Sequence, residues 1–208
     1  FHFLWTLITP LVFVLIKWTV IGTYQQGRYP IWGAYYLRWW FVDICRKIIG
    51  RGIWGSNNYT LCMFYSMLGA EIGEGAHISL EAEIAEFDLV TIGDYAKVEY
   101  STVRGFGLDN GAMILGPVCV DDFASAGVRS VVAPYTKVPT NAHVGPATSS
   151  YEITHDDDSH LQYNRYAVPE PAWWMQVFVG HPITFVVNTF SHLPAMYVLY
   201  NLVKMHYA

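Results

Sequence analysis

Residues that can perform acid–base chemistry gather around one stretch of the sequence, Tyr100 to Met113. This stretch holds Arg104, Asp109 and Asn110, and Glu99 directly precedes it. A carboxylate can accept a proton from a nucleophile, and a guanidinium can bind an anionic group. We therefore predict that Asp109, Glu99 and Arg104 form a polar site. The alternative role for Asp109 is the first residue of an Asp-Asn-Gly turn.

Two histidines, His77 and His143, offer a second kind of acid–base group. The unperturbed pKa of histidine lies close to neutral pH, so this side chain serves most often as a general base. Each of the two stands one position before a residue of the apolar series described below. This position indicates an outward side chain, and a surface or packing role is the alternative for both.

Other familiar signatures are absent from the sequence, which contains no GxSxG, P-loop, GxGxxG or HExxH pattern. The three cysteines, Cys45, Cys62 and Cys119, form no CxxC pair, and we expect buried, reduced thiols. The net charge of −5 gives no indication of nucleic-acid binding. The run HDDDSH at 155–160 mixes hard and soft ligands, which favours a solvated acidic loop, and we expect no metal.

An apolar residue recurs every six positions between Leu68 and Ser150, and a small residue precedes it by two places. The apolar members are Ile72, Ile78, Ile84, Ile92, Val98, Val120, Ala126, Val132, Val138 and Val144. The small partners are Ala70, Ala76, Ala82, Val90, Ala96, Val118, Ala124, Ser130, Thr136 and Ala142. A period of six predicts a parallel β-helix, in which each hexapeptide forms one side of a triangular prism. Ile114 extends the series, and Tyr100–Met113 is expected to be an interrupting loop.

Apolar and aromatic segments precede this repeat. Residues 1–21 carry one charge, Lys17, and as a helix they would span about 31 Å, close to the ~30 Å bilayer core. We predict a transmembrane helix with Lys17 reaching the interface; a buried helix is the alternative. Residues 22–52 predict a turn at Pro30 and an amphipathic helix, either in the headgroup plane or packed on the β-helix. Residues 53–67 are expected to supply lead-in strands to a domain at 53–150.

The segment after the repeat is polar and then apolar again. We predict a linker at 151–171, and at 172–208 a transmembrane helix and the start of another, divided by Pro194. The 16% aromatic content and 14% charged content suit a membrane interface. Basic residues between 28 and 51 predict that the β-helix lies on the cytosolic side. Because the sequence starts with Phe1 inside an apolar run, we expect it to be part of a longer protein.

Several stretches resemble proteins with a hexapeptide repeat. The period itself resembles the left-handed β-helix of hexapeptide-repeat acyltransferases, and DLVTIGD at 88–94 is similar to their lead-in to a coil. Further stretches resemble the membrane-embedded C-terminal left-handed β-helix region of poly-lysine-synthetase-type nonribosomal peptide synthetases. These stretches are LGPVCVDD at 115–122, SVVAPYTKV at 130–138, AHVGPATS at 142–149 and YQQGRYPIWGAYYLRWW at 24–40.

The resemblance implies an all-β core, a left-handed parallel β-helix, flanked by transmembrane and interfacial α-helices. It also implies transfer of an acyl or aminoacyl group from a phosphopantetheine thioester on a carrier domain to an amine, with a histidine base. The resembling proteins carry this histidine in the loop before LGPV, whereas residues 103–110 contain none. The expected catalytic residues are therefore Asp109, Glu99 and His77, with Arg104 and Asn110 binding substrate. A catalytically degenerate copy with a structural or carrier-docking role is the alternative.

The resemblance further implies partners for the chain. Hexapeptide transferases form trimers, so we expect further β-helix copies to complete a trimer or pseudo-trimer. A carrier domain and the lipid bilayer are the other expected partners. The γ-class carbonic anhydrases share the coil but bind zinc through three histidines, and the two coil histidines here do not favour that activity.

Overall fold

The computed structural model describes residues 2–150 and, beyond them, only residues 173–175, 178–179, 182–183, 186, 197 and 204. The chain divides into two compact units, Phe1–Val168 and Pro169–Ala208. In the second unit one short helical turn is described, α5 (Trp173–Met175). The predicted linker with its HDDDSH run lies outside the described residues, as does most of the predicted helical segment at 172–208.

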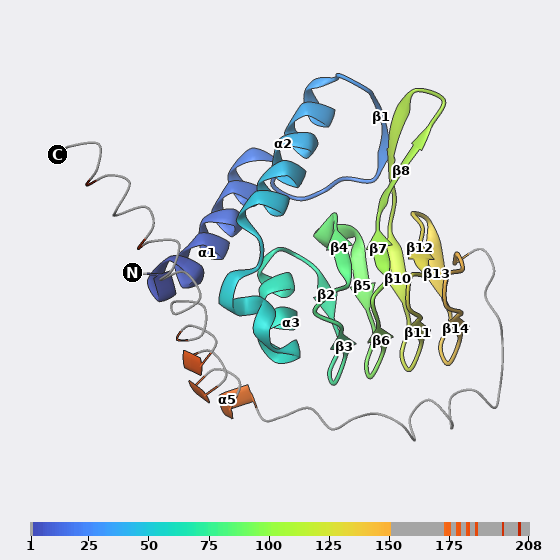
Figure 1. The fold of residues 1–208 in the computed structure, drawn as a ribbon. Helices are drawn as coiled ribbons and strands as arrows, with labels where there is room; N and C mark the ends of the chain where they lie inside the picture. Colours follow the sequence, from blue (N-terminus) through green and yellow to red (C-terminus); the bar gives the residue numbers. More distant parts are fainter. Residues whose placement is uncertain are drawn as a thin grey trace. The chain divides into compact units, whose positions relative to one another are not determined.

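Short parallel strands stack in three sheets, an arrangement consistent with a β-helix (Figure 1). In spatial order the sheets are β13-β10-β5-β2, β14-β11-β6-β3 and β12-β7-β4. The first sheet comprises β2 (Glu71–Ile72), β5 (Val90–Ile92), β10 (Val118–Val120) and β13 (Thr136–Val138). The second comprises β3 (His77–Ile78), β6 (Lys97–Val98), β11 (Ser125–Ala126) and β14 (His143–Val144). The third comprises β4 (Glu83–Ala85), β7 (Thr102–Arg104) and β12 (Val131–Val132).

The predicted hexapeptide series faces the interior of this stack. The buried apolar members are Ile78, Ile84, Ile92, Val98, Val120, Ala126, Val132, Val138 and Val144, while Ile72 in the first coil is partly buried. The small partners are buried as well, except for the partly exposed Thr136. The extension of the series to Ile114 is wrong. Val103 fills that side of its coil instead, in register with Ile84 and Val132.

The coils turn at residues with left-handed backbone geometry. Three positions after an inward residue, φ is positive at Gly75, Tyr95, Phe123, Arg129, Tyr135, Asn141 and Ala147. A non-glycine residue in this region loses about 1 kcal/mol relative to the right-handed region. Six of these seven positions are not glycine, so the stacking of coils fixes the turns more strongly than local backbone preference does.

The stretch predicted as a loop, Tyr100–Met113, contains the coil strand β7 and then most of a β-hairpin. Strands β8 (Phe106–Asp109) and β9 (Ala112–Leu115) pair antiparallel around Asn110 and Gly111, both of which have positive φ. This backbone geometry is typical of a two-residue hairpin turn. The edge strand β1 (Gly27–Pro30) pairs with β9 on its other side, so Pro30 ends a strand. Proline is tolerated there because an edge strand leaves some N–H groups unused.

Three helices precede the coils: α1 (His2–Val20), α2 (Ala34–Ile49) and α3 (Asn58–Met67). Two 3₁₀ turns, η1 (Gly52–Ser56) and η2 (Phe87–Leu89), complete the elements. The strands expected at 53–67 are therefore wrong. None of the helices within the described residues has the length and hydropathy that crossing a membrane requires, so the predicted span at 1–21 is not supported.

Lys17 of α1 does not reach toward an interface, contrary to the expectation from sequence. Its side chain is fully buried, and its Nζ lies 2.8 Å from a carboxylate oxygen of Asp88, which follows the first coil. The same carboxylate accepts a hydrogen bond from the backbone N–H of Tyr24. Gly69 leaves room for it, because a Cβ at that position would lie 2.2 Å from Asp88 Oδ1. This pair fastens α1 to the coils.

Side chains of Arg51 and α3 cover the open strand edge of the first coil. Asn58 donates from Nδ2 to the carbonyl oxygen of Ala76 (3.0 Å) and accepts from the N–H of Ile78 (2.7 Å). Arg51, immediately before η1, donates to the carbonyl oxygens of Leu80 and Ala82. These groups replace the backbone partners that a further coil would supply, and they protect the edge from pairing with another chain.

The interior of the coils should not tolerate a charge. We expect Val132→Asp to abolish stable folding or to lower the free energy of unfolding by more than about 4 kcal/mol, because it buries an unpaired carboxylate. Val131→Asp is the matched control: Val131 is 46% exposed, whereas its neighbour Val132 is 0% exposed. Urea unfolding of both variants measures the difference. Equal stabilities would contradict the inward assignment of Val132.

Candidate functional site

A cluster of buried and partly buried charges joins α2 to the coils. We call Asp43, Arg46, Glu83, Glu86 and Arg104 the charge cluster. Arg104 makes a two-pronged contact with Glu86, with nitrogen–oxygen distances of 2.7 and 3.2 Å. Its terminal nitrogen also lies 3.2 Å from Asp43 of α2. Arg46 bridges Asp43 and Glu83 at 2.9 and 2.8 Å, so carboxylates and guanidinium groups alternate across the contact.

Glu86 is the most unusual member of the charge cluster. Only 1% of its surface is exposed, and its backbone has a φ of +52°. Its carboxylate accepts a hydrogen bond of 2.8 Å from the indole N–H of Trp39, and that indole stacks on Phe106 of β8 with ring centroids 4.5 Å apart. Glu86 therefore connects α2, the corner after β4 and, through Trp39, the hairpin.

Two members of the charge cluster, Arg104 and Asp43, have shifted pKa values. Burial alone lowers the pKa of Arg104, but hydrogen bonding to Glu86 and the charges of Glu86, Asp43 and Glu83 outweigh it and raise this pKa. Burial raises the pKa of Asp43, and its contacts with Lys47, Arg46 and Arg104 outweigh burial and lower it. Both directions favour the charged forms, so the cluster is a set of ion pairs.

Arg104 was predicted from sequence to bind substrate. The structure surrounds it with Glu86, Asp43 and Glu83, and its side chain is 15% exposed. Its guanidinium lies 5.3 Å from the ring centroid of Phe106. These contacts assign it to the attachment of α2 and the hairpin.

Asp109 and Asn110 lie at the tip of the hairpin, apart from the charge cluster. Asp109 pairs with Arg28 of β1 through a carboxylate oxygen at 3.5 Å, and Arg28 also donates to its carbonyl oxygen. The side chains of both partners are more than half exposed. Asn110 is the first residue of the hairpin turn. The alternative role of Asp109, next to a turn, agrees with this position.

A row of polar side chains crosses the second sheet. His77, Lys97, Ser125 and His143 are in register across β3, β6, β11 and β14, and we call them the polar row. Each precedes a buried residue of the hexapeptide series, so each points away from the interior. Glu99 stands two positions after Lys97, and so belongs to the same side of the prism. Of the residues predicted from sequence, His77 and Glu99 thus lie on the same side of the prism. Asp109 and Asn110 lie at the hairpin tip instead, and Arg104 lies in the charge cluster.

Ser125 and His143 form a close pair within the polar row. The Ser125 hydroxyl lies 2.6 Å from Nδ1 of His143, and Ser125 is 7% exposed. A hydrogen bond at Nδ1 fixes the orientation of the imidazole ring and directs Nε2 away from the serine. His143 was a candidate base from the sequence, whereas Ser125 was missed. The available signal was the position immediately before Ala126, which is equivalent to that of both histidines.

Cys119 is not an activated nucleophile. None of the three cysteines forms a disulfide within the described residues, and each is partly buried. Burial, together with the hydrogen bond to Asp121 at 3.1 Å, raises the pKa of the Cys119 thiol to about 11. A thiol with this pKa is protonated at neutral pH and is a poor nucleophile. The described residues also contain no group of three metal-binding side chains.

Comparison with known proteins gives one informative similarity. Delta-poly-L-ornithine synthetase of Acinetobacter baumannii (strain AB307-0294) is 30% identical to this chain over 128 residues. The similar region covers 59% of this chain but only 9% of the synthetase. No protein-family profile matches the chain. No solved structure matches it either. The chain is thus distantly similar to a part of a poly-amino-acid synthetase.

The charge cluster should carry a large share of the stability of the first unit. Replacing Arg104 by Met leaves Glu86 buried without its partner, and we expect the free energy of unfolding to fall by about 3–5 kcal/mol. Arg28→Met is the matched control, since it removes an exposed ion pair and should change stability by no more than about 1 kcal/mol. Chemical denaturation compares the two variants. If both change stability equally, the charge cluster is not the attachment described above.

Proposed function

We propose that this chain is a module of a nonribosomal-peptide-synthetase-like enzyme that forms amide bonds. The observation that carries the proposal is the 30% identity over 128 residues to delta-poly-L-ornithine synthetase, whose name describes a polymer of amino acids. The parallel strands in three sheets fit the left-handed β-helix of hexapeptide-repeat transferases, as do the six-residue spacing and the repeated corners. In this proposal the coils are left-handed and carry the transferase site.

The reaction we propose is aminoacyl transfer from a thioester to an amine. The amine nitrogen attacks the thioester carbonyl carbon, and a general base takes a proton from that nitrogen. The carbon–sulfur bond then breaks, the amide carbonyl re-forms, and the thiolate leaves and takes up a proton. A positioned histidine typically accelerates such a transfer by about 10² to 10⁴-fold.

His143 is the base that the geometry favours. Its Nδ1 is 2.6 Å from the Ser125 hydroxyl, which positions the ring as the orienting partner of a general base does. His77, predicted from sequence as a base, lies at the other end of the polar row. Asp109, also predicted as a base, lies at an exposed hairpin tip and contacts Arg28. Glu99 shares a side of the prism with the polar row, which makes it the remaining carboxylate for acid–base work.

The donor in this proposal is a phosphopantetheine thioester on a carrier domain. Its long, flexible arm could lie along the polar row, where Lys97 stands between the two histidines in register. Further β-helix copies would border the site, as they do in the hexapeptide-repeat class that the sequence resembles.

The membrane placement also stays a proposal. It is supported by large apolar side chains that α1, α2 and the turn before α2 leave exposed. Trp32 and Ile48 are more than three-quarters exposed, and Leu15 and Trp40 are about half exposed or more. Trp and aliphatic side chains of this kind suit the boundary between lipid headgroups and acyl chains. We propose that this surface contacts the cytosolic face of a bilayer.

A second function, a structural or carrier-docking module without catalysis, is favoured by a different observation. Arg104 and Asp109, two of the residues selected from sequence, are engaged in contacts that hold the hairpin and α2 in place. In this alternative the polar row binds a carrier domain but transfers nothing.

Substitutions in the polar row decide between the two functions. The assay measures amide formation from an aminoacyl-pantetheine thioester and a diamine acceptor. We expect His143→Ala to lower the rate by about 10² to 10⁴-fold and Ser125→Ala by a smaller factor, because Ser125 only orients the imidazole. Lys137→Ala, an outward change on the first sheet, is the control and should keep the rate. If His143→Ala, His77→Ala and Glu99→Gln all keep the parent rate, the catalytic proposal fails and the docking function is favoured.

A further inference from the structure

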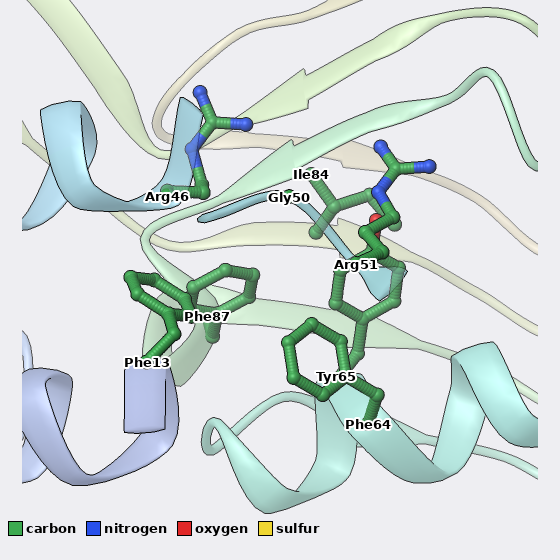
Figure 2. Close-up of a pocket in the computed structure, with 8 residues that line it drawn as sticks. All are labelled: Phe13, Arg46, Gly50, Arg51, Phe64, Tyr65, Ile84 and Phe87. Carbon is green, nitrogen blue, oxygen red and sulfur yellow. The ribbon is translucent and has the colours of Figure 1, made fainter. Parts of the chain in front are cut away.

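A cavity of about 140 Å³ lies where α1, α2 and α3 meet the first coil. Its walls include the rings of Phe13, Phe64 and Phe87, together with Tyr65 and the side chains of two arginines, Arg46 and Arg51 (Figure 2). Figure 2 shows Phe13 and Phe87 together on one side of the cavity, and Tyr65 reaching toward Arg51 on the other. The cavity therefore has an aromatic part and a cationic part.

The Tyr65 hydroxyl is the first sign that the cavity takes a ligand. Tyr65 is 2% exposed, and its buried hydroxyl has no hydrogen-bond partner among the described residues. Buried polar groups of folded proteins nearly always have a partner, so an unpaired one needs an explanation. Burial raises the pKa of this hydroxyl, which keeps it protonated and able to donate.

Arg51 is the second sign. Its guanidinium donates to the carbonyl oxygens of Leu80 and Ala82, which are neutral, and it makes no ion pair within the described residues. It lies 5.7 Å from the ring centroid of Tyr65. Arg46, the other arginine of the cavity, is neutralised by Asp43 and Glu83. The cavity thus combines one uncompensated positive charge with one unused hydroxyl donor.

We propose that this cavity binds a small carboxylate with a compact apolar body. The carboxylate would accept from the Tyr65 hydroxyl and face Arg51, and the body would pack against Phe13, Phe64 and Phe87. A ring-sized body fits, because an engineered apolar cavity of about 150 Å³ binds benzene. A single water could satisfy Tyr65, but it would leave the aromatic walls unfilled and the charge of Arg51 uncompensated.

This site goes beyond the proposed acyl transfer. It shares no residue with the polar row, and its ligand contacts helices α1 and α3 as well as the first coil. A carboxylate bound there would connect the three N-terminal helices to the coils. Loss of binding at this site and loss of amide formation are therefore separate outcomes.

The test uses benzoate as the probe and the whole 208-residue chain. Isothermal titration calorimetry should show saturable binding of benzoate and at least tenfold weaker binding of benzamide, which has the same shape without the charge. Tyr65→Phe should weaken benzoate binding about tenfold or more, since it removes a hydrogen bond to a charged group. This variant should keep the thermal stability of the parent, because the hydroxyl it removes has no hydrogen-bond partner among the described residues.

Tyr59→Phe is the matched control. Tyr59 lies on the same helix, α3, but is 68% exposed, so its hydroxyl should make no difference to benzoate affinity. The proposal is overturned if benzoate does not bind saturably, if benzamide binds equally well, or if Tyr65→Phe and Tyr59→Phe bind benzoate with the same affinity.

Discussion

The ion pair between Glu86 and Arg104 is the contact on which the arrangement of the first unit depends. The carboxylate of Glu86 is 1% exposed, so its polar oxygens need partners, and Arg104 supplies two hydrogen bonds to it. The same carboxylate holds Trp39, and Arg104 holds Asp43, so both partners also bind α2. Since removal of Arg104 would leave Glu86 buried without its cation, and removal of the Glu86 charge would deprive Arg104 of its two-pronged partner, the helix and the coils are coupled.

The coils could be predicted because each hexapeptide follows the same residue pattern. Every side of the prism needs an inward aliphatic residue and a small residue two places earlier. Because the coils stack, this pattern recurs many times in the sequence. The errors fall where tertiary contacts override that pattern. Ile114 matches the period, yet it lies in β9, which forms the hairpin with β8 and also pairs with β1, and Val103 takes the inward position. Lys17 was predicted to reach the membrane interface. The sequence does not reveal its partner Asp88, because that residue lies 71 positions away.

The candidate site could be predicted only in part, for a similar reason. His77 and Glu99 lie on one side of the prism, and the six-residue spacing of the repeats predicts this shared side. Arg104 has the chemistry of a substrate ligand, but nothing local in the sequence reveals that Glu86 and Asp43 surround it. Ser125 was missed because a serine beside an alanine carries no local signal. The role of Ser125 becomes evident only from the strand register, which places its hydroxyl 2.6 Å from Nδ1 of His143.

Hydrogen–deuterium exchange of a Glu86→Gln variant tests this coupling most directly. Glutamine keeps the shape of the side chain but removes the charge of the carboxylate that Arg104 contacts with two nitrogens. If Glu86 couples α2 to the coils, amides of α2 (Ala34–Ile49) should lose protection in this variant, while amides of β5, β10 and β13 should keep the protection they have in the parent chain. Unchanged exchange in α2, or an equal loss of protection in α2 and these strands, would contradict this coupling.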